Sequence, residues 1–153
     1  MSKHDTYMQT ALQAAKISAE KGEVPVGAVI AYNEDIISVA GNEIIQRRDP
    51  TAHAEILAIR SAAEKLGYER LIGCDLYVTL EPCAMCAGAI SLARINHVII
   101  GTLDAKGGAI IHGPQFFQQP TCHHRPEVSH GIMAEAAAEV LVSFFRALRG
   151  QKT

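Results

Sequence analysis

The chain has 153 residues, of which 48% are hydrophobic and 20% charged, and its formal net charge is −2. This length is typical of one domain with a sizeable core, so we treat residues 1–153 as a single domain. No apolar run reaches the roughly 18–20 residues that a membrane-spanning helix needs, and the N-terminus lacks the apolar stretch of a secretion signal. These features argue against a membrane or secreted protein and predict a cytoplasmic one, while the acidic balance is not that of a general nucleic-acid-binding protein.

The first half of the chain alternates helical and strand patterns. Apolar residues at helical spacing predict an amphipathic helix over 6–21. Two β-rich runs follow, 24–31 and 36–42, and the polar turn between them predicts an antiparallel hairpin. A polar loop over 43–52 then leads into a second helix over 53–66, which a glycine ends.

The second half continues the alternation. Residues 74–80 predict a short strand, 83–93 a helix of small residues, and 96–102 an apolar strand. The segment 103–131 has no periodicity and is too long for an idle connection, so we interpret it as a binding loop. A last helix over 133–149 carries Ala, Val, Leu and Phe on its predicted inner face. Strands alternating with helices predict an α/β protein with three α/β/α layers.

Two short segments carry the residues of a metal centre. His53 and Glu55 stand at the start of a predicted helix, and Cys83 and Cys86 stand where a strand turns into a helix. One imidazole and two thiolates make a three-ligand zinc set that leaves a fourth position open, as a catalytic zinc requires. The Cys-x-x-Cys step places both sulfurs on a first helical turn, where the helix dipole favours negative sulfur.

Glu55 is two residues from the predicted ligand His53, so its carboxylate lies near the metal without being forced to bind it. Zinc lowers the pKa of bound water to about 7, which makes hydroxide available at neutral pH. Glu55 would accept the proton of this water and deliver it to a ring nitrogen and then to the leaving amine.

A Cys-x-x-Cys pair alone also fits a redox pair or half of a structural zinc site. Such a site needs a second pair, and Cys74 and Cys122 are neither adjacent nor similarly spaced.

At these residues the sequence resembles the cytidine/deoxycytidylate deaminase superfamily, whose signature is His-x-Glu followed by Pro-Cys-x-x-Cys. Within it, the chain is most similar to the tRNA-specific adenosine deaminases of bacteria. The matching segments are EVPVGAVI (23–30), Gly41-Asn42, DPTAHAEILAIR (49–60), LYVTLEPCAMCAGAISLARI (76–95) and residues 101–106.

The resemblance implies a cytidine deaminase-like fold with a five-stranded mixed sheet and one zinc ion per subunit. The implied reaction converts adenosine to inosine at the wobble position of a tRNA anticodon, by attack of zinc-bound hydroxide at C6 with Glu55 as the proton shuttle. A homodimer is implied as well, in which both subunits contact the anticodon stem-loop. By the same similarity, Asn42 hydrogen-bonds the flipped-out base, Val26 lines its pocket, and the backbone N–H of Ala54 faces it.

The resemblance also implies contacts to the nucleotides beside the target. Asp104 and Lys106 fall where the family touches neighbouring nucleotides, and Phe144 and Phe145 fall where flanking bases are received; core packing is the alternative for both phenylalanines. Basic side chains would hold the RNA backbone. The candidates are Arg47, Arg48, Arg70, Arg94, Arg125, Arg146, Arg149 and Lys152.

Two other functions compete with this interpretation. A deaminase of a free base or nucleoside, such as guanine or cytosine, would use the same zinc chemistry, with the unusual segment 103–131 as a lid. Free-cytidine enzymes generally have Cys-Ala-Glu rather than the His-Ala-Glu found here, whereas guanine deaminases share His-Ala-Glu. A non-catalytic, zinc-stabilised binding module would leave Glu55 and the open fourth position without a purpose.

Finally, Cys122-His123-His124 offers three neighbouring ligands with no fourth partner, which is weak evidence for a second metal.

Overall fold

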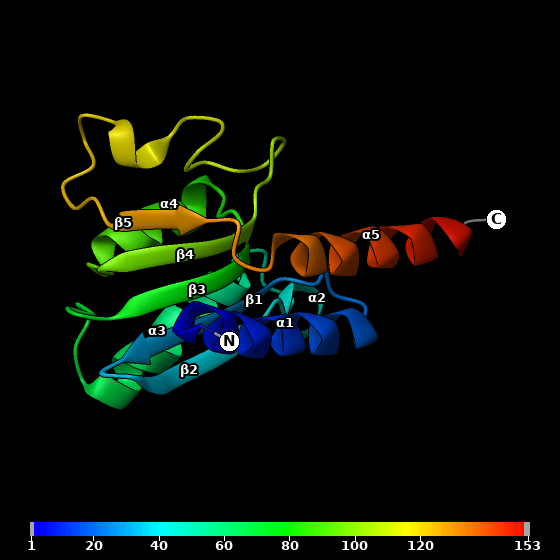
Figure 1. Cartoon of the computed structure of the whole chain (residues 1–153), viewed down its shortest axis with the longest axis horizontal. Helices are drawn as coiled ribbons and strands as arrows, with labels where there is room; N and C mark the ends of the chain where they lie inside the picture. Colours follow the sequence, from blue (N-terminus) through cyan, green and yellow to red (C-terminus); the bar gives the residue numbers. More distant parts are fainter. Residues whose placement is uncertain (1, 152–153) are drawn as a thin grey trace.

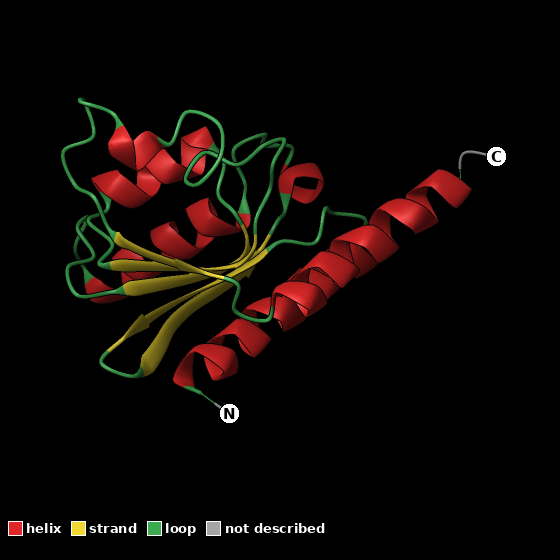
Figure 2. Cartoon of the chain, turned by 45° about the horizontal axis from the view of Figure 1, so that its top comes forward, coloured by secondary structure: helices red, strands yellow, loops and turns green. Residues whose placement is uncertain are grey.

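The computed structural model describes residues 2–151, which form one mixed sheet with helices on both faces (Figures 1 and 2). The elements are α1 (Lys3–Glu20), β1 (Gly27–Tyr32), β2 (Asp35–Gly41), α2 (Ile44–Arg47), α3 (Ala54–Leu66), β3 (Asp75–Leu80), α4 (Ala84–Leu92), β4 (His97–Thr102), the 3-10 turn η1 (Phe116–Gln118), β5 (Glu127–His130) and α5 (Ala134–Gly150). Over this part of the chain, every helix is too short or too polar to cross a membrane.

The strands lie in the order β2-β1-β3-β4-β5. β1 pairs antiparallel with β2 and with β3, whereas β4 runs parallel to both β3 and β5. The predicted five-stranded mixed sheet and the predicted hairpin are therefore confirmed. The chain leaves β2 and β3 toward α3 and α4, and the predicted metal ligands lie where these two helices begin.

The core has two layers because side chains alternate across the strands. Ala28 and Ile30 of β1 belong to the larger layer, under α3 and α4, while Val29 and the buried Tyr77 of β3 belong to the layer under α1 and α5. Helix α1 lies so close to β1 that a Cβ at Gly27 would be 1.8 Å from the carbonyl oxygen of Ala11. The three-layer α/β/α arrangement predicted from the sequence is confirmed.

Two loops contain structure that the sequence patterns did not predict. The polar loop 43–52 includes the single-turn helix α2, and the segment 103–131 ends in β5, which adds the fifth strand beside β4. β5 is only four residues long, with the sequence EVSH, and none of its residues is fully buried. An edge strand of that kind has no apolar alternation for a pattern search to detect.

The inner face predicted for the last helix is wrong for most of its length. Only Ala137 of α5 is buried, and Val142, Phe145 and Leu148 are each at least 39% exposed. The 17 residues of α5 extend roughly 25 Å at 1.5 Å per residue, and only the beginning of the helix is buried. Figures 1 and 2 show α5 running alongside α1 and continuing past the sheet.

Candidate active site

The three predicted metal ligands come together at the N-termini of two helices. His53 is the N-cap residue of α3, Cys83 is the N-cap residue of α4, and Cys86 lies in the first turn of α4. The Nδ1 atom of His53 lies 3.7 Å from Sγ of Cys83 and 3.5 Å from Sγ of Cys86. Within residues 2–151, this trio is the only group of three or more potential metal ligands with mutually close donor atoms, all within 4.8 Å of one another.

These separations fit a tetrahedral zinc ion. Zn–N bonds of about 2.0–2.1 Å and Zn–S bonds of about 2.3 Å at tetrahedral angles give an N···S separation of about 3.6 Å. The two observed N···S distances lie on either side of that value. The predicted zinc ligand set is thereby confirmed as a grouping, and three protein ligands leave a fourth position open toward solvent or substrate.

The two thiols of this set differ in acidity. The pKa of Cys83 is lowered to about 5, chiefly by a hydrogen bond from the Cys86 thiol. Burial opposes this shift, whereas backbone N–H groups and His53 add to it. The pKa of Cys86 is raised because Cys86 donates that hydrogen bond and is buried. The metal-free pair therefore holds a single proton near neutral pH, and a metal ion must displace that proton to bind both sulfurs.

Glu55 lies in the first turn of α3 and is 4% exposed. Burial disfavours its ionised form and raises the pKa of Glu55 to about 7. A carboxyl group with that pKa exchanges protons readily in both directions near neutral pH. Its acidity therefore fits a group that takes up and returns protons during a reaction.

Six residues predicted from the sequence line one cavity of about 250 Å³. They are Val26, Asn42, His53, Glu55, Cys83 and Asp104. The cavity is small compared with the roughly 300–1,000 Å³ of drug-sized ligand sites, so its size suits a single base or ring.

Asn42 braces the segment that carries His53. Its Oδ1 atom accepts the backbone N–H of Ala54 at 2.8 Å, and its Nδ2 atom donates to the carbonyl of Val24 at 3.0 Å. Because His53 has no side-chain cap bond of its own, Asn42 supplies the acceptor for the start of α3. The Ala54 N–H, which the resemblance places against the base, is engaged by Asn42 in this structure.

Residues 1–102 match the family model of the cytidine and deoxycytidylate deaminase zinc-binding region. The chain belongs to this deaminase family. The tRNA-specific adenosine deaminase of Agrobacterium fabrum is 50% identical to it over 97% of this chain and 98% of the relative. A solved structure from studies of A-to-I editing by tRNA:A34 deaminases is 51% identical, with a TM-score of 0.88 over 89% of this chain and 99% of that one. The guanine deaminase of Bacillus subtilis is 31% identical, with a TM-score of 0.64 over 98% and 95% of the two chains.

Family membership makes the protein a hydrolytic deaminase with a zinc-binding domain. Some residues predicted to touch substrate lie outside the cavity of this deaminase. Lys106 is exposed at its rim, with its backbone N–H on Asp104. Phe144 and Phe145 lie on α5 with ring centroids 5.3 Å apart, and Phe144 lines a groove between α1 and α5. These three residues stay predictions as substrate contacts.

The segment Cys122–His124 fastens the long loop to α4. Ser91 of α4 donates to the carbonyl of His124 at 2.7 Å and lies 3.5 Å from Sγ of Cys122, while Nε2 of His124 lies 2.6 Å from the carbonyl of Ile95. Of the predicted RNA-backbone cations, Arg47 is paired with Glu43, and Lys152 lies outside the described residues.

Sequence reasoning missed five residues that line the cavity: Val24, Ile44, Leu80, Glu81 and Gly107. Of these, Glu81 falls in the matching segment 76–95 but was given no role from the sequence. An acidic residue at the end of a buried strand and directly before the ligand segment was the available signal, because buried carboxylates must have partners.

Proposed function

We propose that this deaminase converts adenosine to inosine at the wobble position of a tRNA anticodon, acting as a homodimer in the cytoplasm. The observation that carries the proposal is the similarity to tRNA adenosine deaminases, which runs over nearly the whole chain. It exceeds the similarity to guanine deaminase both in sequence and in fold.

His53, Cys83 and Cys86 would hold the zinc ion. When bound, zinc supplies Lewis acidity that makes water a usable nucleophile at neutral pH. Glu55 accepts a proton from the attacking water and delivers it to N1 of the adenine ring as C6 becomes tetrahedral. It then carries a second proton to the departing amino group, and its raised pKa suits both directions of transfer.

Asn42 and Val26 orient the base in the cavity. The side-chain amide of Asn42 has two N–H donors and two acceptor lone pairs, and its bonds to Ala54 and Val24 use one of each. One donor and one lone pair therefore stay available for the edge of a purine. The flipped-out base would reach this position from a single-stranded loop, where unstacking costs little.

Residues at the rim of the cavity and beyond it would meet the rest of the anticodon loop. Asp104, which lines the cavity, and the exposed Lys106 would form the rim nearest the target base, and the exposed ring of Phe145 would offer a stacking surface for a flanking base. The dimer part of the proposal is supported by α4, whose Met85 and Leu92 are 38% and 76% exposed. Exposed apolar side chains beside a ligand-bearing helix suit an interface between two copies.

The alternative of a free-base deaminase required the long loop to act as a lid. In the structure only Asp104 and Gly107 of that loop line the cavity, whereas Phe117 and Cys122 are buried in the core layer under α4. A loop fastened to α4 in this way leaves the mouth of the cavity accessible to a nucleotide that is part of a chain.

The test is inosine formation in an anticodon stem-loop with adenosine at the wobble position, compared with free adenosine, guanine and cytosine under the same conditions. We expect conversion of the stem-loop alone and none by the Glu55→Gln variant. Conversion of free guanine alone would reassign the protein to nucleobase chemistry with the same metal centre. Light scattering in solution tests the dimer, and a monomer at micromolar concentration would contradict it.

A further inference from the structure

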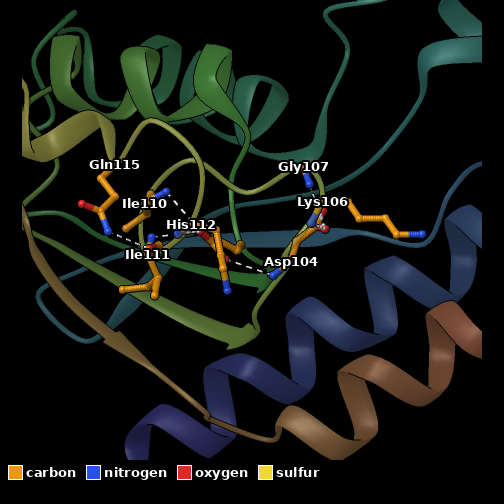
Figure 3. Close-up of polar contacts among 8 residues, drawn as sticks. Asp104, Lys106, Gly107, Ile110, Ile111, His112 and Gln115 are labelled. Atoms are coloured by element: carbon orange, nitrogen blue, oxygen red, sulfur yellow. Dashed lines mark hydrogen bonds and ion pairs between the residues drawn. The ribbon is translucent and has the colours of Figure 1, made fainter.

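Glu81 directly follows β3 and has a side chain that is 0% exposed and is hydrogen-bonded by five donors. Its Oε1 atom accepts the backbone N–H of Asp104 at 3.0 Å and lies 2.8 Å from Nδ1 of His112. Its Oε2 atom accepts three consecutive backbone N–H groups, those of Ile110, Ile111 and His112, at 2.9–3.1 Å. Figure 3 shows Asp104, Ile110, Ile111 and His112 gathered around one point, although Asp104 lies eight positions before His112 in the sequence.

No Lys or Arg neutralises this carboxylate within the described residues; its one ion-pair partner there is His112. The negative charge is instead held by backbone dipoles, because consecutive N–H groups that point inward form an anion-binding concavity. The backbone approaches so closely that a Cβ at Gly108 would lie 2.3 Å from Cδ of Glu81 and 2.5 Å from the carbonyl of Asp104. The loop is therefore folded around the Glu81 carboxylate.

The segment folded in this way forms a wall of the active site. Asp104 and Gly107 line the cavity, and Oδ1 of Asp104 accepts the backbone N–H groups of Lys106 and Gly107 at 3.1 and 3.0 Å. Glu81 is also two residues before the ligand Cys83 and connects to it through Pro82. The Glu81 carboxylate thus connects two parts of the site. One is the wall, which is proposed to meet RNA, and the other is the segment that holds the metal.

We propose that Glu81 is a positioning residue that fixes the wall 104–112 relative to Cys83 and so sets the affinity for the nucleotides beside the target base. The placement of the wall follows from the contacts of Glu81 alone, whereas the identity of the ligand rests on the proposed function. Glu81 does not touch the reacting atoms.

The opposite wall provides a matched control. Glu23 is 1% exposed and accepts the backbone N–H groups of Ile45 and Gln46 at 3.0–3.1 Å, next to Ile44 of the cavity lining. Glu23→Gln is therefore the same change at an equally buried carboxylate that holds a different loop.

The experiment compares Glu81→Gln and Glu23→Gln by amide hydrogen exchange, zinc content and stem-loop kinetics. A glutamine amide must turn its NH₂ group toward at least one backbone N–H of the loop, which removes hydrogen bonds worth about tenfold or more in local opening. We expect exchange at Asp104 and 110–112 to rise about tenfold in Glu81→Gln, and exchange at 45–46 to rise in Glu23→Gln. Both variants should retain one zinc per chain.

The kinetic expectation separates positioning from general damage. In Glu81→Gln the KM for the stem-loop should rise about tenfold while kcat falls less than about threefold, because binding is weakened and the proton shuttle is intact. Unchanged exchange at 104 and 110–112, or a kcat loss that follows zinc loss at constant KM, would overturn the proposal.

His112→Ala serves if Glu81→Gln does not fold, because it removes only the ring contact and keeps the backbone donors. It should raise exchange in the same segment by about twofold to fivefold, and no rise there would equally overturn the proposal. If the wild-type chain fails to convert the stem-loop, the proposed function fails, and the exchange measurements still decide the role of Glu81.

Discussion

Replacing Asn42 by Ala should weaken the support of the segment that carries His53 and so weaken zinc binding. The Asn42 side chain is 5% exposed and bridges the backbone N–H of Ala54 and the carbonyl of Val24. Alanine removes both bonds without offering a substitute, and the site is too buried for water to take over fully. The N–H of Ala54 adjoins His53, so the imidazole loses the brace that holds it toward the two sulfurs.

The magnitude follows from the two partners left behind. Each buried backbone group without a partner costs about 1–3 kcal/mol, so the variant should lose roughly 2–6 kcal/mol of unfolding free energy. For a chain of about 150 residues, each kcal/mol corresponds to about 2–4 °C, which predicts a fall of roughly 4–24 °C in the unfolding midpoint.

Urea unfolding with zinc in excess measures the stability, and competition with a chromogenic chelator measures zinc affinity without RNA. Asn96→Ala is the control, because Asn96 is exposed and makes one side-chain bond of 3.3 Å, to Asp75. We expect weaker zinc binding and lower stability in Asn42→Ala but not in the control. An Asn42→Ala variant within about 0.5 kcal/mol of wild type, with unchanged zinc affinity, would refute the bracing role and leave Asn42 a substrate contact only.

Three further perturbations test the centre itself. Glu55→Gln should lower kcat by about 10²–10⁴-fold while zinc content by atomic absorption stays at one per chain, and near-normal turnover would remove Glu55 from the mechanism. Cys86→Ala should lose both bound zinc and thermal stability, because metal binding contributes to folding; normal zinc content would take Cys86 out of the ligand set. Burial raises the pKa of Glu81, but the hydrogen bonds from Asp104 and His112 outweigh burial and lower it to about 2. Its stabilisation is thus complete above the ordinary value of 4.5 and is lost as pH falls toward 2. Urea unfolding of the zinc-free chain should show a loss of up to about 3 kcal/mol over that window, absent in Glu81→Gln.

The parts of the fold that were predicted from the sequence are those that local chemistry determines. Gly67 ends α3 in the left-handed conformation with φ of 80°, as a glycine after a helical pattern indicates. The β-rich runs 24–31 and 36–42 and the polar turn between them predicted the hairpin, and the alternation of strands with helices predicted the layers. His53, Cys83 and Cys86 were found because their residue types and spacing admit few other purposes, and each ligand lies where a helix begins.

The parts that escaped prediction depend on contacts between distant segments. β5 is recognisable as a strand only because β4 pairs with it, and α5 has an apolar stripe whose outer half finds no partner within the described residues of one chain. The role of Glu81 required knowing that residues 23 to 31 positions later in the chain return to it. No window of sequence contains both sides of such an interaction.

This division between local and distant determinants separates the placement of the metal centre from the placement of the loop. The metal ligands and Glu55 are placed by the starts of α3 and α4, whereas the wall 104–112 is placed by its hydrogen bonds to Glu81. The wall needs only backbone N–H groups for Glu81 and a glycine at 108 to make room for it, conditions that many sequences satisfy. Beyond the wall, Ser91 and Cys122 fasten the loop to α4. If Asp104 and Lys106 contact substrate as proposed, changes at this rim alter recognition while Glu55, in the first turn of α3, keeps its place.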